Sequence, residues 1–366
     1  MGNTTRWGVR ALGLLVGLSL VAAACGDSSS GSSSGGSSKT GKIALLLPES
    51  QTARYETQDR PNFEAKLKSL CAKCEILYSN ADQDAAKQQT QAEAALTNGA
   101  KVMVLDPVDG TAAAAIATTA KAKSVPVISY DRLIKNSDID VYISFDNEKV
   151  GRLQGQALVD KLKKDGKSSG DLVMINGSPT DNNASLFKKG AHSVIDTSGF
   201  KVAAESDTVE WKADNAQKDM DGHITKVGKD KIVGVYAAND GTAGGAIAAM
   251  KNAGIKPLPP VTGQDAEVAG IQRILAGDQF MTVYKAIKPQ AEGAAQAAID
   301  LLNGKKPANA TAKVNNGKID VPSILLDPVA VTKDNVKDTV IKDGFWKATD
   351  ICTAAFADAC KAASIA

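Results

Sequence analysis

The sequence predicts an α/β protein made of two doubly wound lobes. Short apolar runs alternate with helical patterns along the chain, and the alternation starts again after residue 147. Alternating strands and helices favour parallel sheets that carry helices on both faces. The stretch from residue 42 to residue 366 is also longer than one hydrophobic core usually supports, so we expect two lobes.

Four runs in the first part are typical of buried parallel strands, because they are brief, apolar and end in Pro, Asn or Asp. They are 42–48 (KIALLLP), 74–80 (CEILYSN), 101–107 (KVMVLDP) and 125–131 (VPVISYD). A helix is expected over residues 84–98, which open on Asp84, repeat alanine and leucine at helical spacing, and stop at Asn98-Gly99. Residues 111–123 repeat this pattern.

A second series follows the run 141–147 (VYISFDN). We expect helices through Val150 and Leu158, after Asp181, after Trp211 and from Gly244. The strands expected between and after them are 171–177 (DLVMING), 201–206 (KVAAES), 231–240 (KIVGVYAAND), 261–265 (VTGQD) and 281–285 (MTVYK).

The N-terminal residues have the pattern of an export signal. Arg6 and Arg10 precede an uncharged stretch over residues 11–24, which is too short to span a bilayer. The sequence Ala-Ala-Ala before Cys25 resembles the lipobox of bacterial lipoproteins, in which the cysteine is acylated and becomes the new N-terminus. We therefore expect a signal peptide over 1–24 and a lipid anchor on Cys25; an ordinary cleavage site beside a chance cysteine is the alternative.

The segment that follows Cys25 supports an anchor, because residues 26–38 are serine and glycine apart from Asp27, with almost nothing to bury. We expect residues 25–41 to tether a globular body above a membrane, outside the cytoplasm. Since Arg6 and Arg10 are the only charged residues before Cys25, the net charge of +2 becomes 0 in the mature chain. A balanced charge gives no basic patch for nucleic acid.

The other four of the five cysteines form two close pairs, Cys71 with Cys74 and Cys352 with Cys360. In an oxidising compartment these pairs predict two small disulfides. A Cys-X-X-Cys motif also suits a redox centre or half a zinc site, but it occurs once, and His192 and His223 are the only histidines. We expect no metal site, no cofactor and no catalytic histidine.

Polar residues follow the predicted strands where parallel sheets bind ligands, at the carboxyl ends. Carboxylate acceptors beside Arg, Lys and Asn donors suit a ligand rich in hydroxyl groups, because each hydroxyl donates once and accepts twice. The alternative is that Asp and Asn only cap the following helices. The residues are Asp106, Asp131, Arg132, Asp181, Asn182, Asn183, Asn239, Asp240, Gln264, Asp265 and Lys285.

Five motifs in this order resemble those of the D-xylose-binding proteins of bacterial ABC importers, a group of type I periplasmic sugar-binding proteins. They are YDRLIKNSDIDVYISFDNEKVG, GSPTDNNASLFKKG, NDGTAGGAIAAM, GQDAEVAGIQRILAGDQFMTVYK and KDTVIKDGF, and the similarity runs from about Lys42 to about Trp346. The resemblance implies the type I periplasmic binding protein fold, with two lobes joined by three crossovers near Asp146, Ala286 and Asp320.

On this resemblance, the first lobe comprises residues 42–147 and 286–320, and the second comprises 148–285 and 321–346. A tail over 347–366 carries the second cysteine pair, extends past the family pattern, and is expected not to touch the site. The implied sugar-binding residues are Arg54, Tyr55, Asp131, Arg132, Asp181, Asn183, Trp211, Asn239, Asp265 and Lys285.

Two aromatic residues in this set can cover the C–H faces of a sugar ring while polar groups bind its rim. Tyr55 stands where the family usually has Trp, which affects the fine choice of sugar. Trp211 lies among charged residues in VEWKADN, where a role confined to the core is the less natural alternative. The GTAGG sequence at 241–245 matches no phosphate-binding motif and indicates close helix packing instead.

The implied function is capture of a xylose-like pyranose and its delivery to an ABC importer permease, by a monomer that is lipid-anchored and extracytoplasmic. Binding of another aldose such as glucose or ribose, or sensing of sugar for a membrane signalling partner, would use the same site. An enzyme could use Asp131 and Asp265 as acid and base, but the importer-like motifs and the anchor argue against it.

Overall fold

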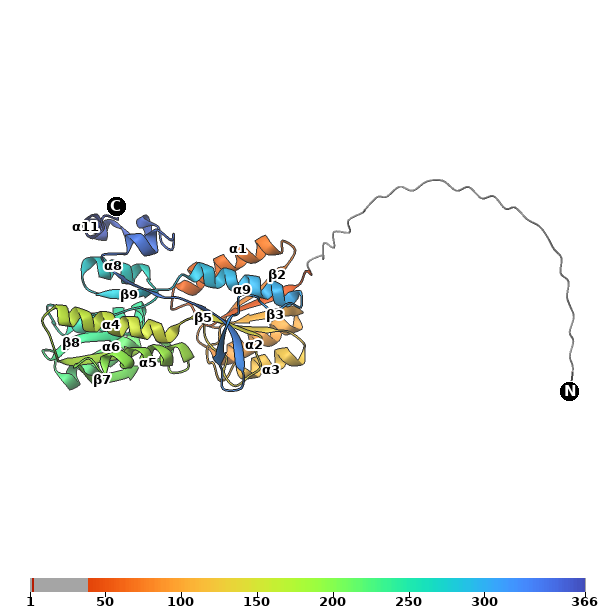
Figure 1. The fold of residues 1–366 in the computed structure, drawn as a ribbon, viewed down its shortest axis with the longest axis horizontal. Coiled ribbons are helices and arrows are strands. Elements are labelled where there is room, and N and C mark those ends of the chain that lie inside the picture. Colours follow the sequence, from red (N-terminus) through yellow and green to blue (C-terminus); the bar gives the residue numbers. More distant parts are fainter. Residues whose placement is uncertain (1, 3–38, 366) are drawn as a thin grey trace. The chain divides into compact units, whose positions relative to one another are not determined.

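The computed structural model describes Gly2 and residues 39–365, and residues 39–365 fold into two α/β lobes (Figure 1). The expected signal peptide, Cys25 and the serine-rich segment lie outside the described residues. Among the residues that are described, no helix is both long and apolar enough to cross a membrane.

The first lobe is built on a seven-stranded sheet in the order β10-β11-β5-β4-β3-β1-β2. Its neighbouring strands are parallel except for the antiparallel pair β10 and β11. The strands are β1 (Lys42–Leu47), β2 (Glu75–Asn80), β3 (Ala100–Leu105), β4 (Val127–Tyr130), β5 (Val141–Phe145), β10 (Ala312–Asn315) and β11 (Asp320–Leu326).

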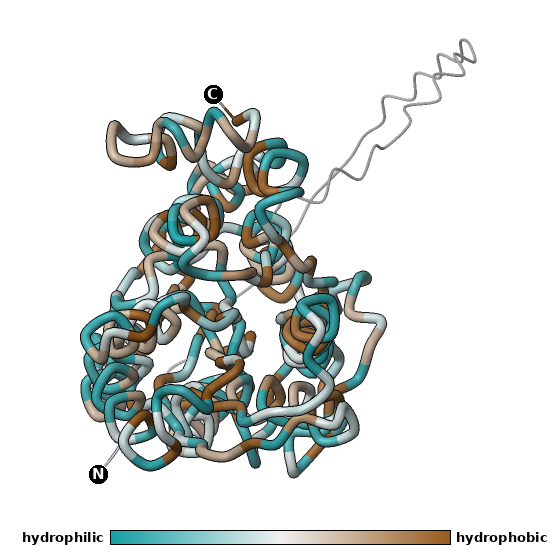
Figure 2. Tube along the Cα trace, turned by 90° about the vertical axis from the view of Figure 1, so that its left-hand side faces the viewer, coloured by the Kyte–Doolittle hydropathy of each residue, from teal (hydrophilic) through white to brown (hydrophobic). Residues whose placement is uncertain are grey.

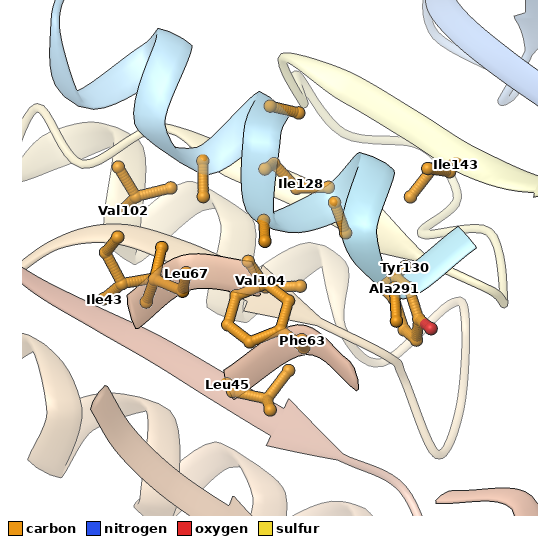
Figure 3. Packing of buried hydrophobic residues seen from close by; sticks show 14 of the residues in the cluster. Ile43, Leu45, Phe63, Leu67, Val102, Val104, Ile128, Tyr130, Ile143 and Ala291 are labelled. Carbon is orange, nitrogen blue, oxygen red and sulfur yellow. The ribbon is translucent and has the colours of Figure 1, made fainter. Parts of the chain in front are cut away.

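Helices cover both faces of this sheet, because its central strands are apolar on both sides. On one face, α1 (Arg60–Leu70) packs beside α9 (Ile287–Leu302), and a short π-helical turn η1 (Tyr55–Asp59) leads into α1. Figure 3 shows Phe63 of α1 beside Leu45 and Val104 of the sheet, and Ala291 of α9 beside Tyr130 of β4. The other face carries α2 (Ala85–Thr97) and α3 (Ala114–Ala122).

The second lobe has a parallel sheet in the order β7-β6-β8 and an antiparallel pair β9 and β12. Single bridges from Val235 to Val261 and from Gln264 to Val283 connect β8 to β9 through the segment between them. The strands are β6 (Asp171–Asn176), β7 (Lys201–Asp207), β8 (Ile232–Ala237), β9 (Met281–Tyr284) and β12 (Val329–Thr332).

Paired helices cover the two faces of the second sheet. One face carries α4 (Asn147–Lys164) and α5 (Asn182–Ile195), and the other carries α6 (Ala213–Val227) and α7 (Asp240–Asn252). Figure 2 shows hydrophobic and hydrophilic residues mixed within the coiled segments of the trace, as expected for helices buried on one side. A short 3₁₀ turn η2 (Val209–Trp211) and helix α8 (Val268–Ala276) complete the lobe.

Two predicted boundaries were wrong. Helix α7 begins at Asp240 rather than Gly244, because Asn239 and Thr242 form a capping box that starts the helix earlier. The third crossover follows Leu326 rather than lying near Asp320, because β11 pairs in parallel with β5 and so extends the first lobe's sheet. That pairing covers an edge of β5 that would otherwise expose unpaired backbone groups.

The C-terminal residues pack against α8 of the second lobe (Figure 1). They form the turn η3 (Lys337–Ile341), helix α10 (Ala348–Ile351), the turn η4 (Ala354–Phe356) and helix α11 (Ala357–Ala362). A disulfide joins Cys352 to Cys360 across this tail, and another joins Cys71 to Cys74 after α1, as the sequence predicted.

Close packing of α4 against α5 depends on glycine. A Cβ atom at Gly190 of α5 would lie 2.0 Å from the carbonyl oxygen of Glu148 in α4. At Gly222 of α6, by contrast, a Cβ atom would meet no heavy atom within 4 Å. We expect Gly190→Ala to lower the free energy of unfolding by about 1–3 kcal/mol through overpacking. Gly222→Ala should leave it unchanged or raise it by up to about 1 kcal/mol, through better helix propensity.

Denaturant unfolding followed by circular dichroism measures both changes. Equal stability of Gly190→Ala and the wild type would contradict the close contact between α4 and α5.

Candidate functional site

A pocket between the two lobes brings together all ten residues that the sequence predicted for the ligand site. The cavity among these side chains is small, about 20 Å³, and the wider space that includes its opening to solvent is about 280 Å³. The lining residues are Thr52, Arg54, Tyr55, Asp131 and Arg132 of the first lobe and Asp181, Asn183, Phe187, Trp211, Asn239, Gln264, Asp265 and Lys285 of the second.

The pocket forms where the strands of both lobes end. Arg54 and Tyr55 follow β1, Asp131 follows β4, Asn239 follows β8 and Lys285 follows β9. Because the carboxyl ends of parallel strands meet at one edge of a sheet, these distant segments converge. None of the lining residues comes from the tail after residue 346.

In the first lobe's half of the pocket, Asp131 accepts several hydrogen bonds. It has a φ of 55°, and its carbonyl oxygen accepts hydrogen bonds from Ser144 and Asn183 at 2.7 and 3.1 Å. Its carboxylate accepts one from Arg54 at 3.1 Å. Burial disfavours the charged carboxylate, but Arg54 and Lys285 attract it and hold the pKa of Asp131 below its usual range. Asp131 is therefore a fixed hydrogen-bond acceptor.

Arg54 is buried and donates hydrogen bonds to three residues, Asp131, Asp59 and Gln290. Its guanidinium donates to both carboxylate oxygens of Asp59, at 2.9 and 2.8 Å, and to Gln290 at 2.8 Å. Gln290 in turn donates to Asp131 at 3.1 Å, while Asp59 also accepts a hydrogen bond from Tyr130. This closed network holds Asp131 and Arg54 in one geometry.

Arg132 of the first lobe lies among carboxylates of both lobes. Its guanidinium is 3.2 Å from Asp181, 3.6 Å from Glu49 and 3.7 Å from Asp106, and it donates to the hydroxyl of Tyr55 at 3.2 Å. Burial, reinforced by the charge of Asp131, raises the pKa of Asp106 well above its ordinary value. A raised pKa favours the protonated acid, so Asp106 can sit behind Arg132 without adding a full negative charge.

The second lobe provides an ion pair and two aromatic rings. Lys285 lies 3.0 Å from Asp265, whose φ is 88°. Phe187 meets Trp211 edge to face at a centroid distance of 6.4 Å. Trp211 also packs so closely on Gly177 that a Cβ atom there would lie 1.9 Å from the ring. The indole N–H of Trp211 is buried and has no hydrogen-bond partner among the described residues, so it is available to a ligand.

The capping alternative holds for two of the predicted residues. Asp181 accepts a hydrogen bond from the Asn183 backbone as the N-cap of α5, and Asn239 caps α7. Asp131 and Asp265 cap no helix, and both have positive φ values that are uncommon for residues other than glycine. Helix capping therefore explains the positions of Asp181 and Asn239 but not those of Asp131 and Asp265.

Three lining residues were absent from the predicted site: Thr52, Phe187 and Gln264. Gln264 was noted at a strand end, next to Asp265. Phe187 could have been found, because it lies four residues after Asn183 on α5 and so shares its helix face. Thr52 belongs to the loop after β1, where the sequence carries no such spacing signal.

The rim of the pocket also joins the lobes directly. Gln83 donates to the backbone carbonyl of Glu210 at 3.1 Å, and Thr180 donates to the carbonyl of Val108 at 3.3 Å. The lobes are therefore in contact around the pocket.

The alternative uses of cysteine and histidine find no support within the described part of the chain. Cys71 and Cys74 are disulfide-bonded, and no three His, Cys, Asp or Glu residues are grouped so as to hold a metal ion. His192 pairs with Asp196 and Glu205, and it does not line the pocket.

Several known proteins are similar to this chain in sequence and in fold. A family model described as a periplasmic binding protein domain matches residues 43–306. The D-xylose-binding periplasmic protein of Escherichia coli is 42% identical over 318 residues, which cover 86% of this chain and 93% of the relative. A multiple sugar-binding periplasmic protein of Azospirillum brasilense is 35% identical over 83% of this chain and 89% of its own length.

Among solved structures, a solute-binding protein of an ABC transporter from Clostridium phytofermentans, with bound β-D-glucose, superposes with a TM-score of 0.78. It is 32% identical, and the match covers 85% of this chain and 99% of that protein. These relatives are solute-binding proteins rather than enzymes. The extent of the match shows that this chain belongs to the periplasmic binding protein family.

Proposed function

We propose that this protein binds one pyranose molecule, with a preference for D-xylose over other sugars, and delivers it to the permease of an ABC importer. The observation that carries the proposal is the pocket itself, in which two lobes contribute carboxylates, cations, amides and an indole to one site. The similarity to a D-xylose-binding protein and to a multiple sugar-binding protein supports a sugar as the ligand.

The chemistry of the lining suits neighbouring hydroxyl groups. The carboxylates of Asp131 and Asp265 accept hydrogen bonds, Arg132 and Lys285 donate them, and amide side chains such as that of Asn239 do both. Charge-assisted hydrogen bonds are shorter and stronger than neutral ones, so the pocket can select the orientation of each hydroxyl.

Aromatic rings suit the remaining surface of a sugar. Trp211 offers an apolar face and Phe187 packs against its edge, so a pyranose can lie with its C–H groups on the indole. The guanidinium carbons of Arg54 and Arg132 lie 5.2 and 5.7 Å from the centroid of the Tyr55 ring. Tyr55 thus orders both arginines as well as lining the pocket.

Closure of the lobes is the proposed signal to the importer. Each lobe supplies part of the contacts, so the bound sugar favours the closed form, in which all of them are made. The hydrogen bonds that Gln83 and Thr180 make between the lobes also stabilise the closed form. The site is complete within one chain, which supports action as a monomer.

An enzymatic use of Asp131 and Asp265 is disfavoured by their surroundings. General acid catalysis needs a carboxyl that holds a proton near neutral pH, whereas the pKa of Asp131 is held low once Arg54 and Lys285 outweigh its burial. Asp265 is paired with Lys285. A receptor that senses the sugar for a signalling partner would use the same pocket, and is distinguished by whether loss of the protein abolishes sugar uptake.

We further propose that the protein is anchored outside the cytoplasm through a lipid on Cys25. The lipobox-like sequence and the serine-rich residues 26–38 support this proposal. Labelled palmitate should enter the wild type but not Cys25→Ser when each is expressed in cells. Wild-type protein that carries no lipid and is released freely into the medium or periplasm would contradict the anchor.

Substitutions in the pocket test the sugar site. We expect Asp131→Ala, Arg132→Ala and Asp265→Ala each to weaken D-xylose binding by about tenfold or more, because a buried partner is left unpaired, at a cost of about 1–3 kcal/mol. Trp211→Ala should weaken it comparably by removing the ring face. Isothermal titration calorimetry measures the dissociation constants.

Asp171→Ala is the matched control, because Asp171 begins β6 and lies at the opposite end of that strand from the pocket. It should bind D-xylose as the wild type does. Circular dichroism must show that every variant is folded. If folded Arg132→Ala and Asp265→Ala both keep wild-type affinity, the pocket is not the sugar site.

A further inference from the structure

The turn that carries Asp265 into the pocket has an uncommon backbone conformation. Asp265 and Ala266 have φ values of 88° and 48°, and Ala266 is fully buried. Consecutive residues other than glycine adopt positive φ values only where the surrounding structure holds them there. The orientation of the Asp265 carboxylate therefore depends on the contacts of this turn.

Three hydrogen bonds hold the backbone of Asp265 and Ala266 in this turn. The backbone N–H of Asp265 donates to the carbonyl of Val283 at 2.9 Å, and that of Ala266 donates to the hydroxyl of Thr282 at 3.2 Å. Both of these partners belong to β9. The third contact comes from a distant part of the chain: the indole N–H of Trp346 donates to the carbonyl oxygen of Ala266 at 2.8 Å.

Trp346 also belongs to an aromatic stack that lies next to Lys285, the residue that forms an ion pair with Asp265. Its ring packs edge to face on Phe345 at 5.2 Å, and Phe345 packs in the same way on Tyr284 at 5.1 Å. Tyr284 directly precedes Lys285, the partner of Asp265. The stack thus contacts the chain next to both members of the ion pair. It bonds to Ala266, which follows Asp265, and it includes Tyr284, which precedes Lys285.

The same stack also contacts the first lobe. The backbone carbonyl of Phe345 accepts a hydrogen bond of 3.0 Å from Gln58, which lies in the turn η1 just after Arg54 and Tyr55. The segment 345–346 therefore connects the turn of Asp265 to the element that begins the first lobe's half of the pocket.

We propose that Trp346, which does not line the pocket, is a positioning residue that holds Asp265 in the orientation needed to bind the sugar. The inference rests on the proposed function, because it assumes that Asp265 contacts the ligand. It assigns a binding role to a residue outside the pocket, through one hydrogen bond to the backbone.

The test begins with Trp346→Phe, which keeps an aromatic ring in the stack but removes the N–H donor. The dissociation constant for D-xylose should rise by about three- to tenfold, the effect of one buried hydrogen bond. Gln272→Ala is the matched control, because Gln272 donates from α8 to the carbonyl of Ile351 at 3.0 Å without touching the turn. Gln272→Ala should leave the dissociation constant within about twofold of the wild-type value, which is below the change expected for Trp346→Phe.

A double-mutant cycle separates positioning from general packing. If Trp346 acts through Asp265, adding Trp346→Phe to Asp265→Ala should change the dissociation constant by less than about twofold. An equal loss in both backgrounds would overturn the inference and indicate a packing role. If Asp265→Ala binds as the wild type does, the sugar site itself is misassigned, which is a distinct result.

A measurement on unsubstituted protein serves even if Trp346→Phe does not fold. Of the three tryptophans of the chain, Trp7 lies in the proposed signal peptide, so the mature protein has two indole N–H signals, and Trp211→Phe assigns them. Coupling between the sugar and the turn is reciprocal, so saturating D-xylose should slow hydrogen exchange of the Trp346 indole by about threefold or more. Exchange at an unchanged rate would overturn the proposal.

Discussion

The pairing of the Asp131 carboxylate with the Arg54 guanidinium is the interaction on which the pocket depends. Both groups are almost fully buried, and a buried charge is tolerated only when it is paired and hydrogen-bonded. Asp59 and Gln290 complete the pairing from η1 and α9, which lie far apart in the sequence. A carboxylate held charged and fixed in this way can accept hydrogen bonds from a ligand without rearranging.

The fold makes this arrangement possible because both lobes contribute polar side chains to the pocket. In the first lobe a hydrogen-bonded network surrounds Asp131, and Arg132 lies between Asp106 of the same lobe and Asp181 of the second lobe. In the second lobe several polar atoms, including the Trp211 indole N–H, remain without partners among the described residues. In the first lobe, Nε of Arg132 also lacks a hydrogen-bond partner among the described residues. Both halves of the pocket thus offer buried polar atoms to a ligand, which favours closure around a polar one.

Much of this could be predicted from the sequence, because buried parallel strands are short apolar runs and their carboxyl ends carry the polar residues. Ten pocket residues were predicted, although the resemblance to sugar-binding proteins, rather than spacing, identified Arg54, Tyr55 and Trp211. The rest depends on tertiary contacts. Nothing local reveals that β11 pairs with β5, that Gln290 of α9 reaches Asp131, or that Trp346 reaches the turn of Asp265.

Calorimetric titration of the purified protein with D-xylose, D-glucose, D-ribose, L-arabinose and D-galactose tests the central claim most directly. The account predicts saturable binding of one D-xylose per chain, with a dissociation constant of about 1 μM or lower and weaker binding of the other sugars. It also predicts that the sugar is recovered unchanged. The absence of binding for all five sugars at millimolar concentration would contradict the account.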